Sequence, residues 1–187
     1  MERQRLFIAI DISDETRRAV KEYVGQLSEV RDTGVRWEKI EKIHLTLRFL
    51  GNTDANRIPR IQQALSGVVS DHSAFDLTIE ATGVFPNRKN ARVLWLGVRD
   101  SVPLLRLHRS VETALEKVGS RPEQRIFSPH LTIARVKDPR TARLTVETHL
   151  RSAFRPVRFA VNELVLYESK TLPTGSTYSV IAKSRLS

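Results

Sequence analysis

The sequence predicts an α+β fold of two lobes, each an antiparallel sheet with helices packed outside, related by a pseudo-twofold axis around a central cleft. Two observations support this fold class. Hydrophobic runs typical of strands alternate with helical patterns along the whole chain. The order strand, helix, strand, helix, strand also occurs twice, with equivalent positions about 86 residues apart. Two copies of a unit of this size suggest an internal duplication of a two-layer unit.

The first half of the chain contains apolar runs that predict strands and two amphipathic helices. The segment 5–11 is short, apolar and rich in Ile and Phe, which is typical of a buried strand. Ser13 or Asp14 can cap the first helix, and Asp54 can cap the second. We expect strands at 5–11, 35–37, 43–50 and 75–85, and helices at about 14–30 and 55–68.

The second half follows the same order after a basic loop at 86–90. A strongly apolar strand comes first, and the alternating segment 154–167 predicts one long strand near the end. We expect strands at 92–98, 127–136, 154–167 and 177–183, and helices at about 101–118 and 139–150. The chain is then a single domain, 1–187, with lobes of approximately 1–87 and 88–187 between which strands can be exchanged.

The composition indicates an anionic partner. Lys plus Arg number 31 and Asp plus Glu 21, which gives a formal charge of +10 and suggests nucleic acid or phosphate esters as ligands. A basic surface without a specific partner is the alternative. The absence of Cys excludes a disulfide framework and thiolate metal sites. Because we find neither a signal peptide nor a run of about 18 apolar residues, we expect a cytoplasmic monomer without a membrane span.

One tetrapeptide occurs twice. His44-Leu45-Thr46-Leu47 and His130-Leu131-Thr132-Ile133 are near copies, 86 positions apart (44 to 130). Alternate side chains share one face of a strand. Each motif therefore presents one imidazole and one hydroxyl to the cleft and turns its aliphatic side chains into the core.

Two imidazoles and two hydroxyls suit phosphodiester cleavage without a metal or other cofactor. One imidazole can take a proton from water and the other can give one to the leaving oxygen. The hydroxyls can donate hydrogen bonds to phosphate oxygens. A pair of half-buried structural histidines is the alternative, but the matched duplication argues against it. Two His alone fall short of the three ligands usual at catalytic zinc, and the chain has no glycine-rich nucleotide motif.

These motifs resemble those of the 2H phosphoesterase superfamily. The chain looks most similar to its RNA 2′,3′-cyclic phosphodiesterase family, also called 2′-5′ RNA ligase, and the resemblance covers nearly the whole chain. The segments that carry it are 5–9, Trp37 with 44–51 (His-Leu-Thr-Leu-Arg-Phe-Leu-Gly), 83–86 (Gly-Val-Phe-Pro), 92–97 (Arg-Val-Leu-Trp-Leu-Gly) and 127–135 (Phe-Ser-Pro-His-Leu-Thr-Ile-Ala-Arg). The combination is specific, whereas either tetrapeptide alone is weak.

The resemblance implies hydrolysis of RNA 2′,3′-cyclic phosphate ends to 2′-phosphomonoesters, and a reversible 2′-5′ ligation of tRNA halves. It implies His44 as the proton donor to the leaving 3′-oxygen and His130 as the base that activates water. Thr46 and Thr132 would hold the phosphate, with Arg135 as a further contact. By strand parity Arg135 faces away from His130 unless a bulge intervenes.

Basic residues near the motifs are further candidates for RNA contacts. Arg48 shares parity with His44 and could reach the cleft, with a solvated rim charge as the alternative. Arg92, Arg88 and Lys89 flank the central loop and could contact RNA phosphates, although a solvated turn is the alternative for the last two.

Aromatic residues are candidates for base stacking. Phe7, Trp37 and Tyr178 could stack on a base, but core packing is favoured for Phe7 in its apolar strand. Trp95 lies in a run so apolar that we expect it in the core.

Two other functions stay open at this point. One is a phosphoesterase that acts on a small cyclic nucleotide or an ADP-ribose cyclic phosphate. The other is a nucleotide- or RNA-binding module without turnover, against which the intact His of both motifs argues.

Overall fold

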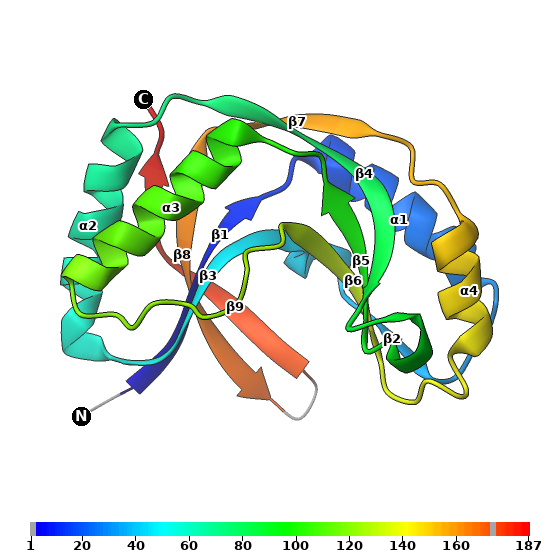
Figure 1. Cartoon of the computed structure of the whole chain (residues 1–187). Coiled ribbons are helices and arrows are strands. Elements are labelled where there is room, and N and C mark those ends of the chain that lie inside the picture. The colour runs from blue at the N-terminus through cyan, green and yellow to red at the C-terminus, as the bar shows by residue number, and fades with distance from the viewer. Residues whose placement is uncertain (1–2, 173–174) are drawn as a thin grey trace.

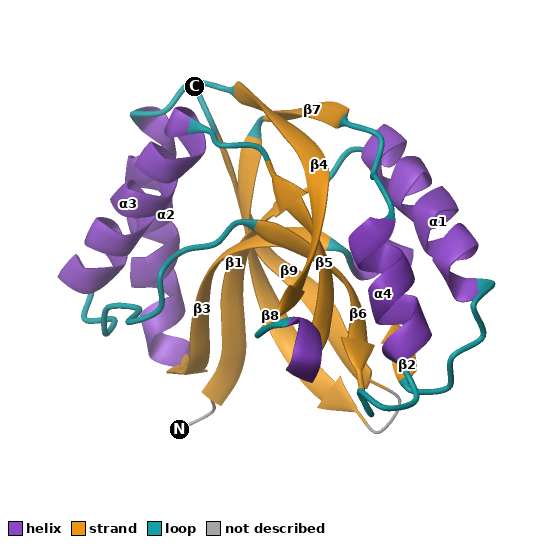
Figure 2. Cartoon of the chain, turned by 45° about the vertical axis from the view of Figure 1, so that its right-hand side comes forward, coloured by secondary structure: helices purple, strands orange, loops and turns teal. Residues whose placement is uncertain are grey.

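The computed structural model describes residues 3–172 and 175–187. In this part of the chain, strands and four α-helices alternate as a curved sheet with helices on its outer side (Figures 1 and 2). The strands are β1 Arg3–Asp11, β2 Val35–Trp37, β3 His44–Asp54, β4 Phe75–Phe85, β5 Val93–Val98, β6 His130–Val136, β7 Val157–Val161, β8 Glu163–Leu172 and β9 Gly175–Arg185. The helices are α1 Asp14–Ser28, α2 Ile58–Ser70, α3 Val102–Lys117 and α4 Arg143–Arg151, with 3₁₀ turns η1 Ile40–Lys42, η2 Ala55–Arg57 and η3 Arg88–Asn90.

The sheet has a symmetric order. It runs β7-β4-β5-β6-β3-β1-β8-β9, with β2 added to β6, and the neighbouring strands are antiparallel. Helices α2 and α3 pack together over the β1, β3, β8 and β9 side, and α1 and α4 cover the β4 and β7 side (Figure 1). The α+β class with two antiparallel lobes and outer helices is therefore confirmed.

The two lobes meet at the motif strands. The one residue pair that joins β3 to β6 is Leu45 with Leu131, the second residue of each tetrapeptide. In an antiparallel pair this register sets residue 44 opposite 132 and residue 46 opposite 130. The centre of the symmetric sheet therefore passes between the two motifs and brings them side by side.

Elements from the two halves of the chain are exchanged between the lobes. Strand β4, from the first half, pairs with β5 in the second, and α1 packs on β7 and α4. One apolar cluster, which includes Leu45 and Leu131, runs under both pairs of helices. The two lobes thus share one core. Their origin by duplication stays a prediction.

Local sequence explains the helices. Ser13 caps α1 by accepting a hydrogen bond from the Thr16 amide at 3.2 Å, and Ser101 caps α3 in the same way through the Leu104 amide. Apolar residues at helical spacing form the buried stripe of each helix, for example Leu104, Leu107 and Val111 in α3.

One sequence expectation near the C-terminus is wrong. The segment 154–167 is not one long strand, because the chain breaks at Asn162 into β7 and β8. Strand β7 pairs with β4, and β8 pairs with β1 on the other side of the sheet. The buried apolar positions change parity at the break, from 157, 159 and 161 in β7 to 164 and 166 in β8, and this shift accompanies the change of lobe.

Several element boundaries also differ from the expected ones. Asp54 does not cap a helix: it ends β3 and forms an ion pair with Arg3 at 3.0 Å, and α2 begins at Ile58 after a 3₁₀ turn. Strand β6 begins at His130 rather than at residue 127, and α4 begins at Arg143 rather than at 139.

Candidate active site

The two motif histidines have the same local geometry. His44 opens β3 and His130 opens β6, and both rings are half-buried. Each Nδ1 lies 2.7 Å from the backbone carbonyl two residues earlier, of Lys42 and of Ser128 respectively. A carbonyl only accepts, and so each Nδ1 carries the hydrogen. Each Nε2 has no hydrogen-bond partner among residues 3–172 and 175–187, which leaves it able to accept or, when protonated, to donate a proton.

Each motif threonine lies two residues after its histidine on the same strand and pairs with a residue of the neighbouring strand. Thr46 pairs with Ala9 of β1, and Thr132 pairs with Trp95 of β5. Both side chains are half-buried, whereas the intervening motif residues Leu45 and Leu131 are fully buried. Neither hydroxyl has a hydrogen-bond partner within the described residues. Both hydroxyls are therefore free to donate to an anion on the histidine face.

Each motif strand has an irregularity at the same place. The pairing of β1 with β3 passes over Leu47, and the pairing of β5 with β6 passes over Ile133, 86 positions later (47 to 133). An extra residue in one strand shifts the following side chains to the other face. The side chains after each bulge therefore point opposite to the direction that simple alternation predicts.

The first bulge makes the prediction for Arg48 wrong. Its side chain is 7% exposed and lies on the helix side, where Nε is 3.1 Å from Glu112 Oε1 and Nη1 is 3.1 Å from Glu123 Oε2. The guanidinium also donates to the Arg121 carbonyl. Arg48 is thus buried in an ion-pair network and does not face the cleft. It anchors the loop that leads from α3 to the second motif.

The second bulge turns Arg135 toward the side of His130. Ala134 is buried in the core and Arg135 is exposed, the reverse of regular alternation. The Arg135 side chain is 53% exposed, and its Nε forms an ion pair with Glu38 Oε1 at 2.9 Å. The bulge that the sequence prediction required for a phosphate contact is therefore present.

An aromatic cluster covers His44. The Phe7 ring stacks on His44 at 4.8 Å, and Tyr178 meets His44 edge-on at 5.4 Å. Tyr167 in turn stacks on Phe7, with ring centres 5.1 Å apart. Phe7 is only 2% exposed, so the burial that the sequence favoured is confirmed and the alternative of an RNA contact is wrong. It is also not part of the helix-side core, because it lies on the histidine face.

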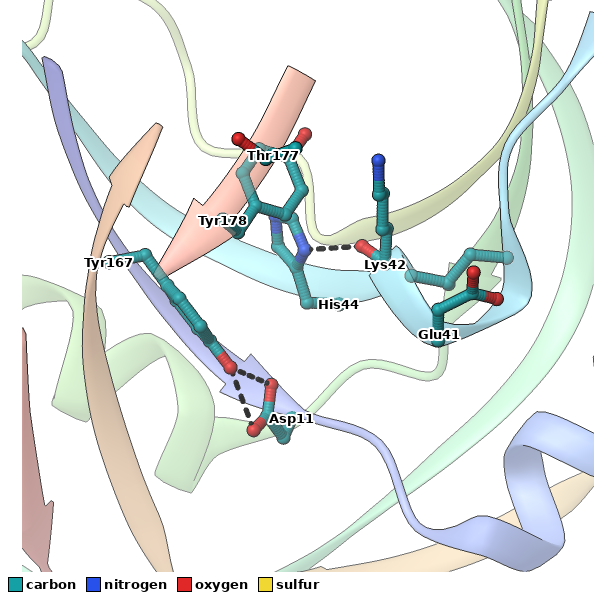
Figure 3. A pocket seen from close by; sticks show the side chains of 8 residues that line it. Asp11, Glu41, Lys42, His44, Tyr167, Thr177 and Tyr178 are labelled. Atoms are coloured by element: carbon teal, nitrogen blue, oxygen red, sulfur yellow. Dashed lines mark hydrogen bonds between the residues drawn. The ribbon is translucent and has the colours of Figure 1, made fainter. Parts of the chain in front are cut away.

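A pocket of about 300 Å³ lies beside His44 (Figure 3). It is lined by Asp11, Glu41, Lys42, Ile43, His44, Tyr167, Thr177 and Tyr178. The Tyr167 hydroxyl donates to both carboxylate oxygens of Asp11, at 2.8 and 2.9 Å, and Asp11 pairs with His44 in the register of β1 and β3. Figure 3 shows the His44 ring between Tyr178 and the Lys42 carbonyl.

Burial acts alike on the two imidazoles, whereas nearby charges act differently on them. Burial lowers the pKa of both His44 and His130, and the bond to a backbone carbonyl partly offsets this. Asp11 and Glu38 raise the pKa of His44, and Arg17 opposes them. Arg135, in contrast, lowers the pKa of His130 further. The carboxylates favour the protonated form at His44, and the guanidinium favours the neutral form at His130.

Comparison with known proteins agrees with this arrangement. Residues 17–171 match the family described as the 2′-5′ RNA ligase superfamily. The chain belongs to the 2′-5′ RNA ligase superfamily. The resemblance found in the sequence is thereby confirmed.

Relatives of this superfamily match over almost their full length. The chain is 34% identical to an RNA 2′,3′-cyclic phosphodiesterase of Thermotoga maritima, over 95% of this chain and 92% of the relative. It is 36% identical to one of Archaeoglobus fulgidus, over 93% of this chain and 96% of the relative. Its structure is similar to that of LigT from E. coli in apo form, with a TM-score of 0.78 and 26% identity, over 100% of this chain and 99% of LigT.

Residues that sequence reasoning missed surround His44. Arg17 of α1 donates from Nη1 to the carbonyls of Ile40 and Ile43, at 3.0 and 3.3 Å, and so holds the 3₁₀ turn that precedes the motif. Asp11 and Tyr167 are brought together from positions 156 residues apart. A polar residue at the end of an apolar strand was the one available signal for Asp11. No local pattern pointed to Tyr167 or Arg17.

The expectation that Trp95 is a core residue is wrong. Its ring is half-buried and lies on the same face as His130, with ring centres 6.4 Å apart. It also lies flat on Gly83, where an added Cβ would come 2.1 Å from its Cζ2 atom. The glycine in the neighbouring strand thus makes room for an indole beside the second motif.

Arg92 and His149 form contacts outside the two motifs. Arg92 is exposed and donates to the Lys137 carbonyl at 3.3 Å, and its contact with RNA stays a prediction. His149 is fully buried between the Tyr23 hydroxyl, at 2.9 Å, and the Gly83 carbonyl, at 3.0 Å. This network joins α1 and α4 to the sheet and has a structural function.

Neither a metal cluster nor a membrane-spanning helix is found in the described part of the chain. Residues 3–172 and 175–187 contain no group of three or more His, Cys, Asp or Glu side chains that could hold a metal ion. None of their helices is long and apolar enough to cross a membrane. Catalysis without a metal or other cofactor stays a prediction.

Proposed function

We propose that this protein is an RNA 2′,3′-cyclic phosphodiesterase that hydrolyses cyclic phosphate ends to 2′-phosphomonoesters by general acid–base catalysis. The observation that carries the proposal is the side-by-side pairing of the two His-x-Thr motifs at Leu45 and Leu131. Diagonal neighbours in such a pair lie roughly 7–8 Å apart, which leaves room for a phosphate group between His44 and His130. The relatives named above carry the same activity in their names.

The two histidines have different functions in this reaction. His130, whose neutral form is favoured by Arg135, takes a proton from the attacking water through Nε2. The water oxygen bonds to phosphorus, and the bond from phosphorus to the ribose 3′-oxygen breaks. Burial lowers the pKa of His44, but Asp11 and Glu38 act against this and favour its protonated form, and His44 gives its Nε2 proton to that 3′-oxygen. The product keeps its phosphate on the 2′-oxygen.

Thr46, Thr132 and Arg135 hold the phosphate between the two imidazoles. The hydroxyls have no other hydrogen-bond partner in the described residues, and the Arg135 guanidinium is half-exposed on the same side as His130. Donors fixed in place before the reaction stabilise the charge that develops on the phosphate oxygens. Arg135 also approaches the site with its Nε already bound to Glu38, which limits its motion.

Four finer assignments stay predictions. They are tRNA fragments as the substrate RNA, reversible 2′-5′ ligation of tRNA halves, a monomeric state and a cytoplasmic location. A small cyclic nucleotide or an ADP-ribose cyclic phosphate is the competing substrate class, and a binding module without turnover is the competing function.

The test uses an oligoribonucleotide with a 2′,3′-cyclic phosphate end, in the presence of a chelator. We expect full activity in chelator, a product with a 2′-phosphate, and near-complete loss of turnover in His44→Ala and in His130→Ala. His72→Ala is the matched control, because His72 bonds to Ser110 away from the motifs. Undiminished turnover in either motif variant would overturn the assignment. Loss of activity in chelator with recovery on zinc addition would overturn the metal-free mechanism.

A further inference from the structure

A second pocket, of about 470 Å³, lies at the outer surface of α4, away from the motif face. It is formed by α4, the turn that precedes it and the 3₁₀ turn η3 between β4 and β5. Its lining residues are Asp32, Arg88, Arg140, Thr141, Arg143, Leu144, Glu147 and Arg151. None of them lines the pocket beside His44. We call this feature the arginine pocket.

Both carboxylates of the arginine pocket are already engaged. Asp32 Oδ2 accepts from the Thr145 amide at 2.7 Å, in the first turn of α4. Glu147 accepts two hydrogen bonds from Arg88, one of them from Nε at 2.7 Å. Both carboxylates of the pocket therefore already accept hydrogen bonds from protein groups.

Three arginines of the pocket form no ion pair in the described part of the chain, and the lining as a whole has more arginines than carboxylates. Arg140, Arg143 and Arg151 form no ion pair within residues 3–172 and 175–187, and all three are exposed. With Arg88 they place four guanidinium groups around one hollow against two carboxylates. Like charges gathered in a concave surface focus a positive potential. The planar guanidinium fork also matches the geometry of a phosphate.

Backbone hydrogen bonds and close packing hold the turn that carries Arg140 in place. The Lys137 amide donates to the Gly34 carbonyl at 2.7 Å, and the Gly34 amide donates to the Thr141 carbonyl at 3.4 Å. Gly34 has no space for a side chain, since an added Cβ would lie 2.4 Å from the Asp138 carbonyl oxygen. This close packing fixes the turn that carries Arg140, as the Arg88 pair with Glu147 fixes the opposite wall.

Basic residues also connect the arginine pocket with the motif face. Strand β6 leads from His130 to Arg135, and exposed Lys137 follows at its end. Arg92 donates to the Lys137 carbonyl, and the Val136 amide donates to the Arg92 carbonyl at 2.9 Å. Positive side chains thus follow the end of the sheet from the catalytic motif to the pocket.

We propose that the arginine pocket binds backbone phosphates of the RNA substrate on the 5′ side of its cyclic phosphate end. This inference rests on the proposed function. Single-stranded RNA fits because its phosphates repeat along a flexible chain that can follow the basic residues around the edge of the sheet. The pocket would then increase the affinity for RNA without taking part in the chemical step.

The test compares a 2′,3′-cyclic mononucleotide with a 12-nucleotide RNA that has the same end, for the double variant Arg140→Gln/Arg143→Gln. We expect unchanged kcat/KM for the mononucleotide and a fall of at least about tenfold for the RNA, with a salt dependence that is weaker by about 1.4 in log–log slope for two lost phosphate contacts. The matched control is Arg106→Gln/Arg109→Gln, which removes two exposed arginines from α3 on the other lobe.

Several outcomes would overturn the inference. Equal losses in both double variants would mean that net charge, rather than the pocket, governs RNA affinity. No loss for RNA, or an equal loss for the mononucleotide, would also refute it. If the unmodified protein hydrolyses neither substrate, the proposed function fails. Fluorescence anisotropy with a labelled 12-nucleotide RNA then still tests the pocket, and equal affinity of the unmodified and variant proteins would refute it.

Discussion

The two motif strands are alike up to the bulge and different after it. Both begin with His bonded to a carbonyl two residues earlier, and both skip a pairing at the fourth motif residue. The next two positions then carry Arg48 and Phe49 in β3 but Ala134 and Arg135 in β6. The two motifs thus place their histidines alike, whereas the residues that follow each bulge differ in charge and burial.

The environments differ in charge. The His44 side contains a carboxylate and an aromatic cover, with exposed Phe49 where the other strand has Arg135. The His130 side contains a guanidinium. A symmetric pair of imidazoles would have no preferred direction for proton transfer. The surrounding charges differ between the two sides, and the direction that we propose, with His44 as the acid and His130 as the base, follows that difference.

The largest expected effect comes from removal of either imidazole. His44→Gln and His130→Gln should each lower kcat by about 10²–10⁴-fold, which is typical for loss of a general acid or base. The residual pH–rate profiles should differ, because His44→Gln removes the alkaline limb and His130→Gln the acidic limb. Profiles in which the limbs are lost the other way round would reverse the acid and base assignments.

The next largest effect is expected at Arg135, whose equivalent position in the first motif strand is Phe49. Arg135→Gln should lower kcat/KM by about 10²-fold because it removes a fixed phosphate donor. The lost positive charge should also raise the pKa of His130, and because the base must be neutral, the acidic limb should move to higher pH. Phe49→Leu is the control at the equivalent position. If the acidic limb moves equally in both variants, Arg135 does not act on His130 by charge.

How much the sequence could predict depends on how local each feature is. The histidines, the threonines and the strand–helix order follow from short patterns, and the structure agrees with the α+β class. Strand parity gave wrong faces for Arg48 and Arg135, because one bulged residue reverses alternation without leaving a mark in the hydrophobic pattern. Likewise, Asp11 and Tyr167 meet only through the pairing of β1 with β8. Such long-range contacts are not encoded in any one segment.

Arg48 offers a test of stability at the position where the other lobe has Ala134. Arg48→Ala should destabilise the protein by about 2 kcal/mol, which is below the usual 3–5 kcal/mol for one partner of a buried pair, because Glu123 is 37% exposed and can be solvated. Urea unfolding at neutral pH measures this loss. The paired variant Arg48→Met/Glu112→Leu should recover part of the stability, since it leaves no unpaired carboxylate on α3. If stability does not recover, the loss in Arg48→Ala comes only from the broken contacts of Arg48 with the loop at 121–123.

The smallest expected effect concerns the carboxylate beside His44. Asp11→Asn keeps an oxygen that can accept from Tyr167 but removes the charge that raises the pKa of His44. The pKa of His44 should therefore fall. Because the acid must be protonated, the alkaline limb of the pH–rate profile should move to lower pH, with a loss of a few fold at alkaline pH and little change at the optimum. Tyr167→Phe keeps the charge and should move this limb much less. If Tyr167→Phe moves the alkaline limb as far as Asp11→Asn does, the aromatic packing rather than the carboxylate sets the proton affinity of His44, and the two lobes differ in shape rather than in charge.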